Sequence, residues 1–297
     1  MNIGVLQLAI AGFCFGFLGI FGKLAFQRQI EIGELLTLRF MTASLILLGI
    51  LSVFRPRLLK VTLKELAVCA LLGALGYAVF STLYFLAVKG VSVAVASLLL
   101  YTFPILVSLG AHFLFKERLT KAQWFAIPIA ALGLAVLLGG GSSLEISQPL
   151  AVVAGLGSAL CYAVYILTSS RLQKNIHPLT SAMYVILFAA IGLALIHRPD
   201  IDRVRSFGIE EWKIIVGIAL VCTVAPLFLF LSGLQKLGNT QASLLSLLEP
   251  VTAAIMGAVV LGEAIMAQTI IGGAIVLCGL AISVGAPMFG RAKTERP

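Results

Sequence analysis

Charged residues are scarce in this sequence. Asp, Glu, Lys and Arg make up 11% of its 297 residues, whereas 60% are hydrophobic, and the mean hydropathy is +1.10. A water-soluble protein of this length needs far more polar surface than that. The composition therefore excludes a soluble globular domain and predicts an integral membrane protein whose main surroundings are the lipid bilayer.

Motifs of enzymes and metal sites are also missing. The sequence has no H-E-x-x-H, no G-x-S-x-G and no G-x-x-x-x-G-K-[ST] loop, and its five cysteines lie inside hydrophobic runs without metal or disulfide spacing. These absences disfavour a membrane protease, a lipid transferase and an ATPase. We expect no enzyme activity, no cofactor and no metal, so any uphill work would draw on an ion or substrate gradient.

Long hydrophobic runs are what the sequence has instead. A membrane-spanning helix needs about 20 mostly apolar residues. Ten such runs are present, with no short alternating segments of the kind that a barrel would need, and we expect the first to be retained rather than cleaved as a signal peptide. The fold class predicted is an all-α integral membrane protein, with spans at 3–26, 33–54, 66–88, 92–115, 120–139, 150–170, 178–197, 212–235, 240–262 and 266–288.

The charges favour a membrane topology over a nucleic-acid partner. The 21 basic residues exceed the 12 acidic ones and give a net charge of +9. Because they are scattered among loops, no nucleic acid is expected. Basic residues gather in cytoplasmic loops of membrane proteins, which predicts that both termini face the cytoplasm.

The sequence also repeats itself. Residues 92–139 align with 238–285 without a gap, and the alignment matches Pro104 with Pro250 and Glu117 with Glu263. We therefore predict two five-helix repeats, 1–140 and 150–288, joined by the flexible GGGSSLEISQP of 139–149 and followed by a cytoplasmic tail, 289–297.

Five helices per repeat would make the second repeat enter the membrane from the opposite side. The loop KERLTK (116–121) is strongly basic, whereas its counterpart GEAIMA (262–267) has no lysine or arginine. Inverted repeats of this kind are typical of secondary transporters that work by alternating access. A channel and a non-transporting membrane scaffold remain as alternatives.

The repeated pattern A-S-L-L-x(4)-P-x(12)-E, at 96–117 and 242–263, resembles the EamA repeat of the drug/metabolite transporter superfamily. Phe15-Gly16, Leu38-Arg39-Phe40 and Ala87-Val88-Lys89 carry the same resemblance. Within the superfamily the chain is most similar to the YddG-type amino-acid exporters. The resemblance implies ten helices around a central cavity, with the fifth and tenth at the periphery. It also implies efflux of small metabolites across the cell inner membrane. Phe103 departs from the symmetry, because the second repeat has Glu249 there.

Two prolines and one acid point to a site at mid-depth. Pro104 and Pro250 each remove a backbone hydrogen bond inside a span, which lipid tolerates only where protein or water satisfies the freed carbonyl. We expect both prolines to bend helices that line the cavity. Glu249 lies near the middle of its span, where a carboxylate costs at least about 2.5 kcal/mol. It is predicted either to serve proton coupling or a substrate ammonium group, or to form a structural ion pair.

Other candidates follow from helical spacing. Polar and aromatic residues recur on single faces of several spans, and tyrosines suit both apolar groups and charged ends of a substrate. The predicted substrate-binding residues are Lys23, Tyr77, Tyr84, Ser97, Tyr101, Tyr162, Tyr165, Ser243, Ser246 and Glu249.

Three neighbouring features receive structural interpretations. GFCFG in the first span is a G-x-x-x-G match that favours close helix packing. Arg39 is most simply paired with Glu31 or Glu34, and Glu117 and Glu263 are expected to share a structural role.

The candidate residues also suggest a class of substrate. Sugar phosphates would require several cavity bases, whereas one acid, one base and several tyrosines suit a zwitterion. We predict export of neutral or aromatic amino acids by a monomer, with purines or cationic drugs as alternative substrates.

Overall fold

The structure is a computed structural model that describes residues 3–90, 93–117, 119–139, 149–173, 176–261 and 267–294. The regular secondary structure of these residues is entirely helical. Residues 140–148 of the predicted linker 139–149 lie outside the described residues, and so does Glu263.

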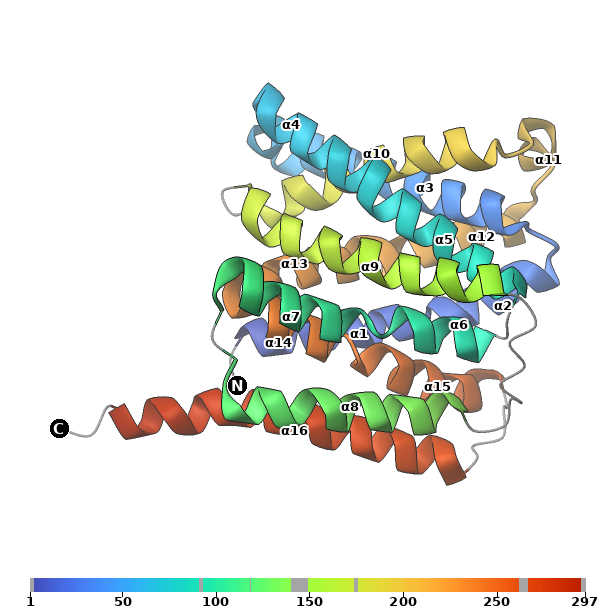
Figure 1. The fold of residues 1–297 in the computed structure, drawn as a ribbon. Coiled ribbons are helices and arrows are strands. Elements are labelled where there is room, and N and C mark those ends of the chain that lie inside the picture. The colour runs from blue at the N-terminus through green and yellow to red at the C-terminus, as the bar shows by residue number, and fades with distance from the viewer. Residues whose placement is uncertain are drawn as a thin grey trace.

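The helices form a bundle in which most run roughly parallel to one another (Figure 1). In the first half they are α1 (Ile3–Gly16), α2 (Leu18–Gln27), α3 (Ile32–Phe54), the 3-10 helix η1 (Pro56–Leu59), α4 (Leu63–Ala70), the π-helix η2 (Leu71–Tyr77), α5 (Ala78–Gly90), α6 (Val93–Leu100), α7 (Phe103–Phe115) and α8 (Lys121–Gly139).

The second half has a similar order of elements. Its elements are α9 (Pro149–Leu172), α10 (Pro178–His197), α11 (Ile201–Arg205), α12 (Ile209–Ala219), the π-helix η3 (Leu220–Val224), α13 (Ala225–Leu237), α14 (Asn239–Leu245), α15 (Leu248–Leu261) and α16 (Ala267–Thr294). The last helix continues through 289–294, the first part of the predicted tail. Figure 1 shows the start of α1 and the end of α16 at the same end of the bundle.

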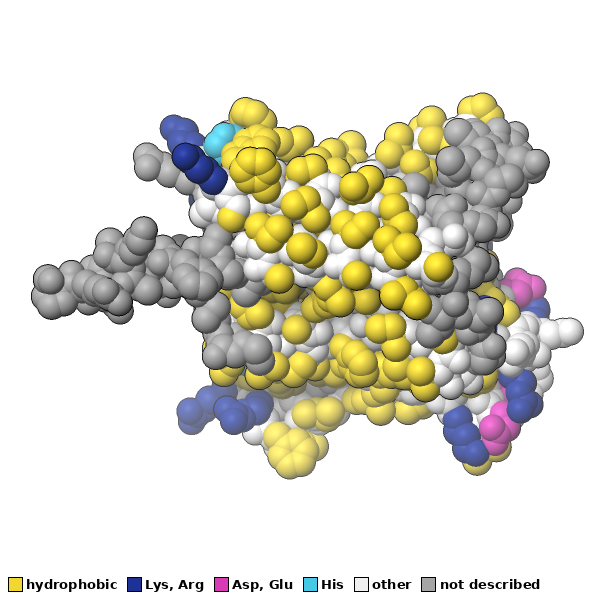
Figure 2. All heavy atoms as spheres, turned by 90° about the horizontal axis from the view of Figure 1, so that it is seen from below, with side chains coloured by type: hydrophobic (Ala, Val, Ile, Leu, Met, Phe, Trp, Pro, Cys, Tyr) yellow, Lys and Arg dark blue, Asp and Glu magenta, His cyan; other side chains and the backbone are white. Residues whose placement is uncertain are grey.

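Seven helical stretches of the described chain are long and apolar enough to cross a membrane, namely 3–27, 32–54, 63–87, 149–172, 178–197, 209–237 and 239–260. Three further apolar helices are shorter: Phe103–Phe115, Lys121–Leu137 and Ala267–Ser283. Figure 2 shows one face of the molecule, with hydrophobic side chains across its middle and charged side chains toward its two ends. That distribution suits a bilayer, since lipid favours apolar side chains and water favours charged ones. The chain is therefore a multi-pass membrane protein.

Small residues let the first helix pack closely against the second half. A Cβ atom added at Gly16 would lie 2.5 Å from the Cβ of Thr252 on α15, and one at Gly12 would lie 3.0 Å from the Cβ of Leu248. Both distances are too short for a larger side chain without a shift. The predicted role of the G-x-x-x-G match in close packing is confirmed.

A second close contact joins α8 to α16 at one edge of the bundle (Figure 1). A Cβ atom at Gly133 would lie 2.5 Å from the backbone nitrogen of Val276, and one at Gly272 would lie 2.3 Å from that of Leu137. The two backbones approach this closely because neither glycine has a side chain. The two helices α8 and α16 therefore form a closely packed pair, which lies at one edge of the bundle.

Candidate functional site

Two helices are interrupted at matching places in the two halves. Tyr101 and Thr102 form a turn between α6 and α7, and Ser246 and Leu247 form a turn between α14 and α15. A proline follows each turn, within the first turn of the next helix, where a missing N–H costs no helical hydrogen bond. After the second interruption the carbonyl of Ser246 accepts a hydrogen bond from the backbone N–H of Glu249, at 3.0 Å.

A hydrogen bond connects the two interruptions. The hydroxyl of Tyr101 donates to the carboxylate of Glu249. Each partner comes from the broken helix of a different half, and each side chain is half-buried. The acid thus stands where four helix ends meet, so a small movement of either half changes its surroundings.

A group of packed aromatic rings includes Tyr77 and Tyr162, which interact with the charge of this acid. The ring of Tyr162 on α9 lies 4.6 Å from that of Phe80 and 4.7 Å from that of Phe103, between centroids. The ring of Tyr77 lies 4.8 Å from Phe80 and 5.5 Å from Tyr165. We call Tyr77, Phe80, Phe103, Tyr162 and Tyr165 the aromatic cluster. The cluster brings together η2, α5, α7 and α9.

The carboxylate of Glu249 acts on this cluster electrostatically. Its charge interacts with the hydroxyls of Tyr77, Tyr84 and Tyr162, in addition to Tyr101. Four tyrosines predicted as binding residues therefore lie around the predicted acid. Such a group of hydroxyls, rings and one carboxylate can accept a cationic group and pack against an apolar side chain.

Arg39 supplies the positive charge at the site. Its side chain on α3 is 4% exposed, its Nε donates to Thr223 Oγ1 at 2.5 Å, and a terminal nitrogen donates to the carbonyl of Cys222 at 2.6 Å. Its charge also interacts with Glu249. Both acceptors belong to the π-helix η3, in which the altered hydrogen bonding can free a carbonyl for a side chain.

The simple pairing expected for Arg39 is therefore wrong. Its hydrogen-bond partners lie in η3, whereas Glu31 and Glu34 pair with Arg203, at 2.7 Å and 3.4 Å respectively. Arg203 reaches them because the connection after α10 folds over the start of α3. The residues around Arg39 in the sequence indicated nearby acids, but the arginine that meets those acids comes from the other half of the chain.

The other predicted residues with hydroxyl groups form hydrogen bonds of their own. The hydroxyls of Tyr84 and Ser97 lie 3.0 Å apart. Those of Ser243 and Ser246 are buried and donate to carbonyls of their own helix, Thr240 at 3.1 Å and Ala242 at 3.0 Å. The role of these serines in binding stays a prediction.

Two predicted residues lie in contrasting surroundings. Lys23 is exposed near the end of α2. Tyr165 is 1% exposed, behind the rings of Tyr77 and Tyr162. Its hydroxyl can meet a solute only if α9 moves.

The difference between the two halves at Phe103 and Glu249 has a counterpart in the structure. Phe103 occupies the position that matches Glu249 in the other half, and its ring contacts Tyr162 and lies 6.1 Å from that of Tyr101. The difference between the halves thus places a ring and an acid at the same mixed site. The π-helices η2 and η3 also lie within corresponding spans of the two halves. Neither of them was predicted from the sequence.

A comparison with known protein families also divides this chain into two similar parts. The model of the EamA-like transporter family matches residues 2–139 and again residues 149–285. This chain belongs to the EamA-like transporter family. The two matches give the EamA two-repeat fold, and an interrupted helix and a π-helix lie at matching places in both repeats.

Similar EamA-type proteins have been given transport functions. The chain is 28% identical over 263 residues to the threonine/homoserine exporter RhtA of Salmonella typhimurium, covering 87% of this chain and 82% of that exporter. It is 29% identical over 214 residues to an uncharacterized transporter of Archaeoglobus fulgidus, covering 70% of this chain and 75% of that protein.

One solved protein structure shares the fold of this EamA-type chain. It has a TM-score of 0.82, covers 99% of each chain, and is 21% identical in sequence. The family consists of transporters and not of enzymes, and the relatives support a role in moving small metabolites.

Proposed function

We propose that this protein exports neutral amino acids across the cell inner membrane by alternating access, with Glu249 and Tyr101 at the centre of the substrate site. The observation that carries the proposal is the hydrogen bond between these two residues, which joins the interrupted helices of the two repeats. A site that spans two moving halves can face either side of the membrane in turn. The similarity to a threonine/homoserine exporter supports this class of substrate.

The architecture required is ten spans in two inverted repeats. The seven long stretches would be completed by α7 with α6, by α8 and by α16. An odd number of spans in each repeat places their matching ends on opposite sides of the bilayer. With the basic loop 116–121 in the cytoplasm, both termini lie there as well.

The chemistry of the site suits a zwitterion. The carboxylate of Glu249 would take the ammonium group, and the positive charge of Arg39 would favour the substrate carboxylate nearby. The aromatic cluster would hold the side chain. Since both protein charges belong to buried or half-buried groups within the span, a neutral solute with two opposite charges disturbs their balance least.

The test is transport by the purified protein in liposomes. Radiolabelled threonine, homoserine, aromatic and branched amino acids, nucleobases and a cationic drug would be offered with and without an imposed proton gradient. Uptake of amino acids above empty liposomes supports the proposal. Selective uptake of nucleobases or the drug would replace the substrate class, and uptake of none by correctly folded protein would favour a scaffold.

A further inference from the structure

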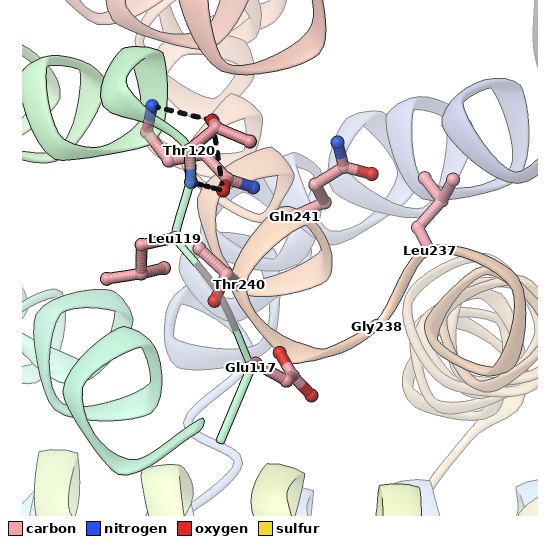
Figure 3. Close-up of a pocket in the computed structure, with 8 residues that line it drawn as sticks. Glu117, Leu119, Thr120, Leu237, Gly238, Thr240 and Gln241 are labelled. Atoms are coloured by element: carbon pink, nitrogen blue, oxygen red, sulfur yellow. Dashed lines mark hydrogen bonds between the residues drawn. The ribbon is translucent and has the colours of Figure 1, made fainter. Parts of the chain in front are cut away.

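A polar pocket that Glu249 does not line lies at the end of the bundle where α7 ends and α14 begins. It has a volume of about 330 Å³, within the range of about 300 to 1,000 Å³ that is usual for small-molecule sites. Its walls come from both repeats: Glu117, Leu119, Thr120 and Gln123 on one side, and Leu237, Gly238, Thr240 and Gln241 on the other. Figure 3 shows these side chains around the pocket.

One carboxylate gives the pocket its charge. Glu117 is half-buried and is the charged residue among the eight that line the pocket. Its Oε1 accepts a hydrogen bond from the side-chain amide of Asn239, at 2.7 Å. A carboxylate has room for several donors on its two oxygens, so this contact holds the group in place and leaves capacity for a ligand.

Two buried polar atoms beside the carboxylate are without hydrogen-bond partners among the described residues. The side chain of Thr240 is 4% exposed and lines the pocket, and its hydroxyl has no hydrogen-bond partner among the described residues. Asn239 is 2% exposed, and its amide oxygen likewise has no partner within the described part of the chain. Buried polar groups are nearly always paired in folded proteins. In Figure 3, Thr240 lies between Glu117 and Thr120.

From this arrangement we propose that the pocket is a second binding site for the ammonium group of a small organic solute. The carboxylate of Glu117 takes the charge, and the hydroxyl of Thr240 accepts one of the N–H groups. An ammonium group matches the site because it brings donors only, and the carboxylate of Glu117 and the hydroxyl oxygen of Thr240 can both accept hydrogen bonds. Identifying the solute with a transported amino acid on its way to Glu249 rests on the function proposed above.

The position of the pocket suits a site that binds the solute before the solute reaches Glu249. It lies between the connection after α7 and the connection after α13, which belong to different repeats. The helices that start or end there, α7 and α14, are the interrupted helices that lead to Tyr101 and Glu249. A solute held here would therefore contact both moving halves before it reaches the centre.

The experiment uses a cysteine at the edge of the pocket as a reporter. In Gln241→Cys, the rate of labelling by a maleimide would be measured on purified full-length protein, with the unsubstituted chain as the blank for its own cysteines. The probe is n-butylammonium chloride, compared with sodium chloride at the same ionic strength. We expect the ammonium probe to slow labelling at least threefold, in a saturable way.

Two further substitutions distinguish binding at Glu117 from a general effect of charge on the labelling rate. Adding Glu117→Gln removes the charge but retains an oxygen for Asn239, and should reduce the protection to less than 1.5-fold. Adding Glu65→Gln, which removes an exposed carboxylate outside the eight lining residues, should leave it unchanged. Equal protection with Glu117→Gln, or equal protection by sodium chloride, would overturn the proposal.

The labelling result can be distinguished from the outcome of the transport assay that tests the proposed function. Protection should persist when Glu249→Gln is added, since the pocket does not use that residue. Its loss in that variant would assign the probe to the central site and refute a second one. Failure of every solute in the liposome panel would refute the proposed function without altering the labelling result.

Discussion

Replacing Glu249 with Gln tests whether its carboxylate holds the ammonium group of the substrate. The Gln side chain has nearly the same shape, and its amide oxygen can still accept the hydrogen bond from Tyr101. The substitution therefore removes the charge and keeps the contact between the interrupted helices. A change in transport can then be attributed to the charge.

The size of the effect follows from the electrostatics of a half-buried site. Two unit charges about 4 Å apart interact by about 4 kcal/mol at an effective dielectric constant of about 20. Desolvation of the ammonium group offsets part of this gain. A net loss of about 2–3 kcal/mol lowers kcat/KM by roughly 30- to 150-fold, since 1.4 kcal/mol is about tenfold.

The assay compares two competitors of amino-acid uptake into liposomes. An amino alcohol has the ammonium group without the carboxylate, and a hydroxy acid has the reverse. Glu249→Gln should raise the inhibition constant of the amino alcohol by about the factor given above and leave that of the hydroxy acid within about threefold. The matched control is Glu65→Gln, which should change neither. Equal losses for both competitors would refute the assignment, because a merely structural defect does not distinguish them.

Four other outcomes are expected. Glu249→Gln should also remove the stimulation of transport by a proton gradient, and stimulation that persists in the variant would eliminate a proton role for this acid. Arg39→Lys keeps the charge but cannot make both hydrogen bonds to η3, so it should cost about 1.5–3 kcal/mol and lower the midpoint of thermal unfolding in detergent; an unchanged midpoint would argue against those bonds. Gly133→Ala should cost about 1–3 kcal/mol by forcing α8 from α16, whereas Gly49→Ala, where no atom lies within 4 Å of an added Cβ, should not; similar midpoints for the two would contradict the close packing. Cysteines at Lys121 and Ala267 should react with an impermeant thiol reagent from opposite sides of the membrane, and reaction from one side would end the inverted arrangement.

Much of the fold could be predicted from the hydrophobic runs. A chain in lipid must satisfy its backbone hydrogen bonds within each segment, so a long apolar run can only be a helix unless it closes into a barrel. The glycines of the first span predicted close packing for a similarly local reason, because a missing side chain is visible in the sequence. The prolines of the two repeats marked the places near which the helices are interrupted.

The site could be predicted in part. Glu249 was a candidate because a carboxylate is costly within a span, and Tyr77, Tyr101 and Tyr162 were candidates because polar and aromatic residues recur on single helix faces. The structure brings these residues together. The position of Arg39 could not be predicted in the same way. Its neighbours in sequence suggested Glu31 or Glu34 as partners, whereas its actual partners belong to a π-helix far along the chain.

The sequence by itself determined that this protein is helical, lies in a membrane and is built from two related halves, because each of these follows from the spacing and polarity of residues along one segment. The tertiary structure alone decided that Tyr101 of one half bonds to Glu249 of the other, and that Arg39 meets η3 instead of its nearest acids. The physical reason is that these contacts depend on which helix faces pack together. That choice is made by the shape of whole surfaces, such as the glycine contacts of α1 with α15, and no single stretch of sequence contains both partners.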